Sequence, residues 1–294
     1  MTGRRVIGVD LGGTKILAGV VDASGRIGEQ IERPTPTDSQ EALLDGLVEA
    51  VGELRTPAIE AVGFGVPARI DPHTGVALGA VNIPLHNLRF RDELEQRLGL
   101  PVSAVNDAGA AALAESVHGA GRGAADLVLL TLGTGVGGGL VFGGRLYRGW
   151  AELGHMVIVE NGEPCQGACT GHGHVESYCS GHAADRLARE TLGPGATARD
   201  LVEQRHPALA EIGRHLGMAI ASLVNIFNPE IVVIGGGFGV AAGELLLEPA
   251  RAVILREALA PAGENVCLAV AELGSKAGLI GASLVAFEAL DSDG

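Results

Sequence analysis

The chain has 294 residues, of which 47% are hydrophobic and 46 are glycine, and its formal net charge is −14. This length is enough for a large hydrophobic core divided between two lobes. The acidic balance excludes the basic footprint of a protein that binds nucleic acid or an anionic membrane, and no apolar run is long enough to span a bilayer. The first residues enter a strand pattern directly, without the features of a signal peptide, which predicts a cytoplasmic protein without a disulfide framework.

Two Gly-rich hairpins are predicted, one at residues 6–26 and the other at 127–145. Each has an apolar β-like run, a turn of Gly and Thr, a second apolar run, and a Gly-containing turn that ends in Arg. Any two Gly-rich hairpins resemble each other to some degree, but this repetition favours a duplication that gave two related α/β lobes.

The rest of the chain alternates between helix and strand patterns. Apolar spacing predicts helices at residues 40–54, 92–98, 108–117, 182–192, 208–227, 243–259 and 276–290. Strands are predicted at residues 61–66, 102–105 and 231–234. Such alternation favours mainly parallel sheets covered by helices. We assign a smaller lobe to residues 1–115, with helix 276–290 packing back on it, and a larger lobe to residues 116–275.

The turn DLGGTK at residues 10–15 follows the first strand and is a candidate phosphate site. Gly12 and Gly13 let backbone N–H groups approach a phosphate, and Thr14 and Lys15 add further donors. Asp10 is a candidate ligand for Mg²⁺, either directly or through water. The spacings of a Walker loop and of a dinucleotide fingerprint are both absent from this turn.

Two further Gly clusters extend this interpretation to a nucleotide. Gly133, Thr134 and Gly135 form a second turn that can face a phosphate. A third cluster follows the strand at 231–234 and offers a flat surface for a purine ring; it consists of Gly235, Gly236 and Gly237. Each cluster alone is also compatible with a tight turn that binds nothing, whereas all three together favour ATP.

Asn106 and Asp107 end a strand and begin a helix. An Asp in this place is often only an N-cap, but Asn106 can cap the helix equally well and leave Asp107 to act on a ligand. A carboxylate can accept the proton of a sugar hydroxyl as that hydroxyl attacks the γ-phosphate. Acidic and imidazole acceptors farther along the chain suit the vicinal hydroxyls of a hexose, or are merely surface charge; they are Glu152, His155 and Glu176.

Residues 153–176 concentrate metal-ligand residue types in a chain that is otherwise poor in them. Cys165 and Cys169 are close enough in sequence to bind one ion, and nitrogen ligands are available from His155, His172 and His174. Thiolate and imidazole ligands together suit Zn²⁺, which prefers four of them in a tetrahedron. The alternative is a polar, Gly-rich loop with incidental histidines. Cys179 and Cys267 have no such neighbours and are expected to be small packing residues.

These motifs together resemble the ROK family, whose members have the actin-like ATPase fold shared by sugar kinases and Hsp70. The resemblance covers nearly the whole chain and is carried by DLGGTK at 10–15, VND at 105–107, LGTGVGGG at 132–139, ELGH at 152–155 and IGGG at 234–237. It implies a two-lobed α/β chain with a duplicated ribonuclease H-like fold. It also implies ATP and Mg²⁺ as ligands, Asp107 as catalytic base, and Asn106, Glu152, His155 and Glu176 as hexose contacts.

The Cys/His loop departs from the usual form of the family, CxCGxxGCxE, because its first two cysteines are separated by three residues instead of one. Counting back from Glu176, His174 occupies the place of the third cysteine. The resemblance therefore predicts a structural Zn²⁺ bound by His155, Cys165, Cys169 and His174, with His172 as the alternative fourth ligand. His155 would bind zinc through one ring nitrogen and sugar through the other.

A second departure concerns the substrate. Glucokinases of the family often have a GP pair after the strand that is predicted here at residues 61–66 and ends at Pro67. This chain has Ala68 and Arg69 in that place. Arg69 could reach an acyl or acidic group of the substrate, or simply lie at the rim of the site. The expected function is phosphorylation of a hexose at its 6-hydroxyl, with glucose as the first choice. Kinases for N-acetylmannosamine, N-acetylglucosamine or fructose are the alternatives, and the sequence does not decide whether polyphosphate can replace ATP.

The family also contains sugar-sensing transcription regulators, which carry an additional N-terminal helix-turn-helix. The phosphate motif of this chain begins at Asp10, which leaves no room for such a segment before it, and the acidic charge disfavours DNA. We therefore expect an enzyme that binds neither nucleic acid nor membrane. The resemblance further suggests a homodimer or homotetramer.

Overall fold

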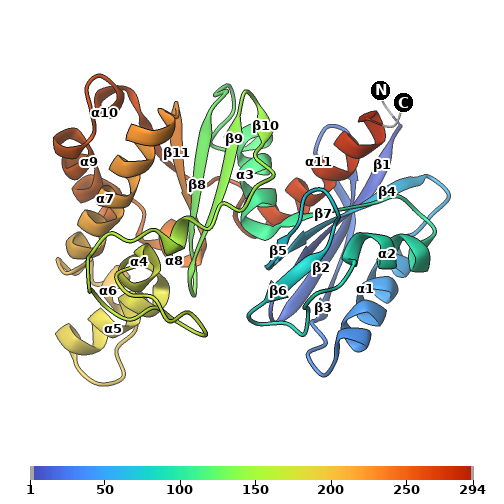
Figure 1. Ribbon diagram of the computed structural model, residues 1–294, viewed down its shortest axis with the longest axis horizontal. Helices are drawn as coiled ribbons and strands as arrows, with labels where there is room; N and C mark the ends of the chain where they lie inside the picture. The colour runs from blue at the N-terminus through green and yellow to red at the C-terminus, as the bar shows by residue number, and fades with distance from the viewer. Residues whose placement is uncertain (1–2, 293–294) are drawn as a thin grey trace. The chain divides into compact units, whose positions relative to one another are not determined.

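The computed structural model describes residues 3–292, and these residues form two compact units (Figure 1). Unit 1 consists of the described residues of Met1–Ala114, Leu146–Trp150 and Ser275–Gly294. Unit 2 consists of Glu115–Arg145 and Ala151–Gly274. Each unit has its own sheet and its own hydrophobic core.

Unit 1 is built on a five-stranded sheet with the order β3-β2-β1-β4-β7. Its strands are β1 (Arg5–Leu11), β2 (Lys15–Asp22), β3 (Ile27–Pro34), β4 (Ile59–Val66) and β7 (Val102–Asn106). The first three strands form an antiparallel meander, whereas β4 pairs parallel with both β1 and β7. A separate two-stranded sheet pairs β5 (Ala68–Ile70) with β6 (Ala77–Ala80).

Different helices cover the two faces of this sheet. The helices of unit 1 are α1 (Gln40–Leu54), α2 (Phe90–Leu98), α11 (Ala277–Ser292) and the first part of α3 (Asp107–His118). Because successive side chains of a strand point to opposite faces, Ile7 and Val9 of β1 pack with α1 and α2. Gly8 and Asp10 of the same strand lie against α11. This alternation places the Asp10 carboxylate beside the first turn of α11.

Unit 2 repeats the plan with the strand order β10-β9-β8-β11-β12. Its strands are β8 (Leu127–Leu132), β9 (Val136–Phe142), β10 (Arg145–Leu146, whose last residue belongs to unit 1), β11 (Ile231–Gly235) and β12 (Cys267–Val270). β8 and β9 form an antiparallel hairpin, and β11 pairs parallel with both β8 and β12. The two sheets therefore share one strand order, which confirms the predicted duplication of an α/β unit.

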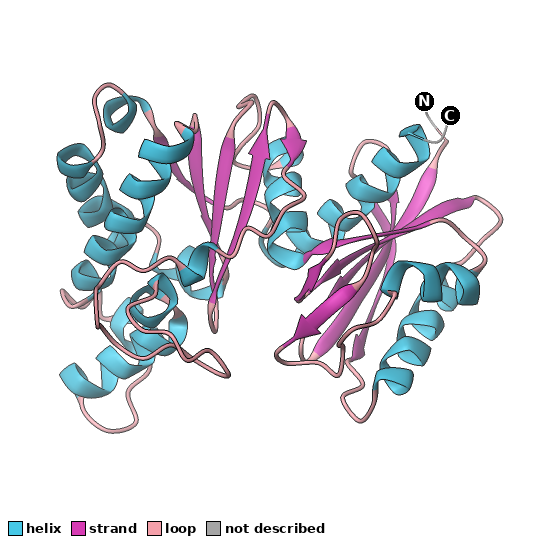
Figure 2. Ribbon diagram, viewed as in Figure 1, coloured by secondary structure: helices cyan, strands magenta, loops and turns pink. Residues whose placement is uncertain are grey.

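Helices pack beside the sheet of unit 2 (Figure 2). The helical segments are η1 (Leu153–His155), α4 (Val175–Cys179), α5 (Gly181–Leu192), α6 (Ala198–Glu203), α7 (Leu209–Phe227), α8 (Gly237–Ala242), α9 (Glu244–Glu257), α10 (Ala262–Asn265) and η2 (Gly274–Lys276, whose last two residues belong to unit 1). Leucines of α7 and α9, such as Leu216 and Leu246, pack with Val128, Leu130 and Val232 of the sheet in one core.

Two expectations need correction. The sheets are mixed instead of mainly parallel, because each begins with the antiparallel hairpin that the Gly-rich turns create. Cys267 is exposed on β12, at one end of the strand order of its sheet, and does not pack in a core, whereas Cys179 is fully buried.

Within residues 3–292, no helix combines the length and the apolar character that crossing a bilayer requires.

Candidate active site and metal centre

The turn between β1 and β2 carries the first predicted phosphate site. The Gly12 N–H donates to the Lys15 carbonyl at 2.9 Å, which closes the turn. Thr35, a buried residue that sequence reasoning missed, donates from its hydroxyl to the Gly12 carbonyl at 2.7 Å and from its N–H to the Thr14 carbonyl at 3.0 Å. These bonds fix the backbone of the turn. The Lys15 ammonium is exposed and contacts Glu32 at 2.8 Å.

Asp10 has an unusual electrostatic environment at the end of β1. Burial, together with the nearby Asp107 carboxylate, raises the pKa of Asp10 to about 7, and Lys15 opposes both effects. Two carboxylates that disfavour each other's ionisation are a suitable place for a divalent cation, because its charge removes the repulsion between them. The oxygen donors also match the preference of Mg²⁺. The residues present therefore fit the magnesium ion that the fold implies.

Asn106 and Asp107 have different partners at the start of α3. The Asn106 Oδ1 accepts hydrogen bonds from the N–H groups of Ala108 and Gly109, at 3.0 and 3.3 Å, and thereby caps the helix. Its Nδ2 donates to the Ala68 carbonyl at 3.4 Å. Asp107 accepts from the Ala108 N–H at 2.9 Å and is half-buried. Capping by Asn106 means that the helix terminus does not depend on the Asp107 carboxylate alone.

The turn between β8 and β9 in unit 2 holds the second Gly cluster. The Gly133 N–H donates to the Gly135 carbonyl at 2.9 Å. The Glu176 Oε2 accepts from the Val136 N–H at 2.9 Å. A Cβ added to Gly135 would lie 2.1 Å from this same oxygen, so a larger residue there would displace the Glu176 carboxylate. Glu176, predicted from sequence as a hexose contact, thus supports the β8–β9 turn in this structure.

The third Gly cluster joins β11 to α8. Gly235 is the last residue of the strand, Gly236 turns the chain, and Gly237 begins the helix. A Cβ on Gly237 would meet nothing within 4 Å, which leaves the backbone open to a ligand. The same is true of Gly133. The structure therefore exposes backbone at both predicted nucleotide-binding positions of unit 2.

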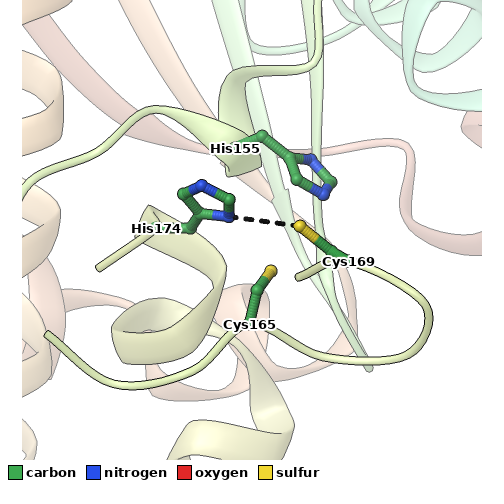
Figure 3. A group of neighbouring side chains, drawn as sticks. All are labelled: His155, Cys165, Cys169 and His174. Carbon is green, nitrogen blue, oxygen red and sulfur yellow. Dashed lines mark hydrogen bonds between the residues drawn. The ribbon is translucent and has the colours of Figure 1, made fainter. Parts of the chain in front are cut away.

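Four side chains of the Cys/His loop converge in unit 2 (Figure 3). They are His155, Cys165, Cys169 and His174, and their candidate ligand atoms all lie within 4.8 Å of one another. The Cys169 Sγ lies 3.7 Å from the His174 Nδ1, and the rings of His155 and His174 have centroids 5.2 Å apart. His172 does not join them, since its Nδ1 lies 3.2 Å from the Gly162 carbonyl oxygen.

Backbone hydrogen bonds hold this loop in shape. The Cys165 N–H donates to the Gly171 carbonyl at 2.9 Å, and the Gly173 N–H donates to the Glu163 carbonyl at 2.8 Å. The Val175 N–H donates to the Met156 carbonyl at 2.9 Å. These antiparallel contacts bring the segment of His155 beside that of His174, although the two residues are far apart in sequence.

The donor set fits a zinc ion. Zn–S and Zn–N bonds of about 2.3 and 2.1 Å in a tetrahedron place neighbouring ligand atoms about 3.4–3.8 Å apart, close to the spacing found here. Burial and the hydrogen bond with Cys169 raise the pKa of Cys165 to about 11. A bound cation counteracts this shift, because it stabilises the thiolate form of its ligands. Beside the cluster, the His155 Nδ1 lies 3.7 Å from Glu152 Oε2, and both side chains are exposed.

Trp150 was not singled out from the sequence. It belongs to unit 1, and the Arg69 Cζ lies 5.6 Å from the centroid of its ring. Two signals pointed to it: it is the single tryptophan of the chain, and it stands two residues before Glu152 of the ELGH motif.

Comparison with known proteins identifies the family. Residues 6–289 match the model of the ROK family. The chain belongs to the ROK family. Among ROK relatives, the glucokinase of Streptomyces coelicolor is 36% identical over 312 residues, which cover 96% of this chain and 97% of the relative. The N-acetylmannosamine kinase of Salmonella newport is 34% identical over 299 residues, which cover 95% of this chain and 97% of the relative.

A solved structure agrees with this assignment. The ROK glucokinase of Streptomyces griseus, in complex with glucose and AMPPNP, superposes with a TM-score of 0.81 at 36% identity, covering 97% of this chain and 99% of that chain. The chain therefore has the predicted actin-like ATPase fold of ROK sugar kinases.

Proposed function

We propose that this protein is an ATP-dependent hexokinase that phosphorylates the 6-hydroxyl of glucose. The observation that carries the proposal is the arrangement at the start of α3, where Asn106 caps the helix and Asp107 lies near Asp10 at the end of β1. Whole-length similarity to a glucokinase, and to a ROK glucokinase complex with glucose and AMPPNP, supports this reaction.

The phosphoryl transfer needs a base and a means to stabilise negative charge. The oxygen of the sugar hydroxyl attacks the γ-phosphorus of ATP, and ADP leaves. Asp107 accepts the proton of that hydroxyl during the attack. Backbone N–H groups of the β1–β2 and β8–β9 turns bind the phosphates, and the Gly235–Gly237 segment accepts the purine. A magnesium ion at Asp10 would neutralise charge on the phosphates.

The remaining predicted residues hold the sugar. Glu152 and His155, which follow Trp150 in sequence, are hexose contacts together with Glu176 and with Asn106, which caps α3 beside Asp107. Zinc on the four ligands of the Cys/His loop would be structural, because four protein ligands leave no position for a reactive water. Its place beside Glu152 and Glu176 supports a role in fixing the sugar-binding loop.

Other expectations remain proposals. They are the lobe boundaries at 1–115 and 116–275, a cytoplasmic location, and a homodimer or homotetramer. Similarity to an N-acetylmannosamine kinase favours that amino sugar as the second candidate substrate.

A substrate panel with coupled detection of ADP tests the proposed function. Glucose, mannose, fructose, N-acetylglucosamine and N-acetylmannosamine are compared with ATP as donor, and then with polyphosphate in its place. We expect the highest kcat/KM with glucose and ATP, and a product phosphorylated at the 6-position by phosphorus NMR. A higher kcat/KM for N-acetylmannosamine would support the second candidate, and ADP release with none of these sugars would refute both.

A further inference from the structure

A cation and an aromatic ring lie against each other on the surface of unit 1. The guanidinium of Arg69, on β5, is 5.6 Å from the ring centroid of Trp150, and Trp150 is 55% exposed. This is cation–π geometry, in which the flat guanidinium packs on the ring. Such contact restrains a long side chain that would otherwise sample many rotamers. The contact with Trp150 therefore narrows the range of positions that the exposed Arg69 side chain samples.

The donors of Arg69 remain available for a ligand. Its Nη2 passes beside Gly79 of β6, where an added Cβ would be 3.9 Å away. Within residues 3–292, no carboxylate forms an ion pair with Arg69, and its contact with Trp150 is made to the π face of the ring, which takes none of the hydroxyl acceptors that a sugar would offer. The edge of a guanidinium offers five N–H donors in a fixed fork.

The position of this pair links it to the predicted sugar site. Ala68, the neighbour of Arg69 on β5, accepts the hydrogen bond from the Asn106 amide beside Asp107. Glu152 is the second residue after Trp150 in sequence, so the Cα atoms of the two residues are at most about 7 Å apart. One member of the pair is thus the sequence neighbour of the residue that binds Asn106, and the other is close in sequence to a predicted hexose contact.

We propose that Arg69, positioned by Trp150, determines substrate specificity by donating hydrogen bonds to hydroxyls of the acceptor hexose other than the reacting 6-hydroxyl. This inference rests on the proposed hexokinase function. Two adjacent sugar hydroxyls can accept from the guanidinium fork, and the exposed part of the indole ring suits the apolar C–H face of a pyranose. The ligand class is a neutral, unsubstituted pyranose.

The kinetics of Arg69→Ala test this role. The hydrogen bonds are expected to be equally strong in the ground state and the transition state, so their loss raises KM without lowering kcat. We expect the KM for glucose to rise about tenfold, the size of one lost hydrogen bond to a charged group, while kcat changes less than about twofold. Trp150→Ala should shift KM in the same direction, and Arg69→Lys, which keeps the charge but loses the fork, should be intermediate.

Arg214→Ala is the matched control. Arg214 is an exposed arginine of α7 in unit 2, so this variant loses the same charge from a helix of the other unit. An exposed cation–π pair contributes little to stability, so all variants should keep the wild-type circular dichroism spectrum. The control should leave the KM for glucose unchanged.

Trp150 provides a second readout that does not depend on turnover. Because it is the single tryptophan, glucose binding without nucleotide should change the intrinsic fluorescence in a saturable manner. Arg69→Ala should need about tenfold more glucose for the same change. An unchanged KM in folded Arg69→Ala would overturn the inference while leaving the proposed function intact. A wild-type protein that phosphorylates none of the sugars in the panel would contradict the proposed function itself.

Discussion

At the scale of single residues, the start of α3 shows how two adjacent polar side chains divide their tasks. Asn106 uses its carbonyl oxygen to cap the helix and its amide to bind the Ala68 carbonyl. Asp107 accepts a hydrogen bond from the Ala108 N–H at 2.9 Å. Because Asn106 caps the helix with two hydrogen bonds, the helix terminus does not depend on the carboxylate of the catalytic candidate alone.

Glu115, also on α3, is a buried carboxylate with a structural duty. It is 0% exposed and accepts from the N–H groups of Ala120, Glu272 and Leu273, at 2.9, 3.1 and 2.9 Å. These bonds join the segment after α3 to the segment after β12. This role could not be inferred from the sequence, because two of the three donors, the N–H groups of Glu272 and Leu273, lie 157 and 158 residues farther along the chain.

Removal of this carboxylate should destabilise the protein. Glu115→Ala leaves three backbone N–H groups without the buried carboxylate that accepts from them, and we expect a loss of about 3 kcal/mol in the free energy of unfolding. Glu115→Gln keeps one acceptor oxygen and should lose less. Urea denaturation followed by circular dichroism measures both. Glu29→Ala, at an exposed glutamate of β3, is the control and should stay within about 0.5 kcal/mol of wild type. Equal stabilities of Glu115→Ala and the control would show that the buried bonds contribute nothing.

At the scale of elements, α11 approaches the sheet of unit 1 so closely that its backbone touches glycine positions of two strands. A Cβ on Gly8 of β1 would lie 2.3 Å from the Leu279 carbonyl oxygen, and one on Gly63 of β4 would lie 1.8 Å from that of Ala282. Because these two glycines have no side chains, α11 can pack directly against the sheet. This close packing also places Gly278 of α11 against the Asp10 carboxylate.

Gly63→Ala should therefore move the helix away from the sheet. A methyl group at this distance from a backbone oxygen cannot be accommodated without a shift, and we expect a loss of about 3 kcal/mol in unfolding free energy. Gly52→Ala in α1 is the matched comparison, because Gly52 is exposed and nothing lies within 4 Å of an added Cβ. The free energy of unfolding of Gly52→Ala should rise by about 0.5–1 kcal/mol. Thermal denaturation of the two variants gives the sign of each change, and a stable Gly63→Ala would contradict the close packing.

Elements with a strong apolar period could be predicted from the sequence. The helix expected at 40–54 is α1 with the same bounds, since its leucines recur on one side and Ser39 caps it through its hydroxyl. The strand expected at 231–234 is β11, which is β-branched and fully buried. The short strands β5, β6 and β12 were missed, because they hold only three or four residues and exist through pairing with distant partners. β3 was missed because its alternating pattern is mostly polar and exposed.

The candidate site was predictable to the extent that it lies in local motifs. The motif that contains Cys165, Cys169 and His174 predicts that these residues share one metal site. The structure places them in one cluster with His155. The contact of Glu176 with the β8–β9 turn was not predictable, because it joins segments about 40 residues apart. The stacking of Arg69 on Trp150 depends in the same way on a long-range contact.

At the scale of the whole molecule, two units with the same strand order carry complementary parts of the proposed machinery. Unit 1 holds Asp10, the first phosphate turn and Asp107, whereas unit 2 holds the other two Gly clusters and the Cys/His loop. Within unit 2, the Glu176 carboxylate contacts both Cys165 and the Val136 N–H, at 3.8 and 2.9 Å. The Cys/His loop and the β8–β9 turn are therefore joined through the side chain of Glu176.

Removal of zinc should loosen this connection. We expect about one zinc per chain by elemental analysis of purified protein, and loss of that metal in Cys169→Ser or after treatment with a strong chelator. The metal-free protein should be cut by protease within the loop between η1 and α4, and its affinity for glucose should fall about 10- to 100-fold. Cys267→Ser, at the exposed cysteine of β12, is the control and should retain the metal. Full protease resistance of metal-free protein would argue against a structural ion.

The most direct test of the account compares turnover and sugar binding in Asp107→Asn. The amide keeps the size of the side chain and its capacity to contact a sugar, but it cannot accept the proton. We predict that kcat falls by a factor of about 10²–10⁴, while the dissociation constant for glucose, measured by calorimetry, stays within about threefold of wild type. Near-normal turnover by a folded Asp107→Asn protein would contradict the assignment of the base, and with it the mechanism proposed for this ROK protein.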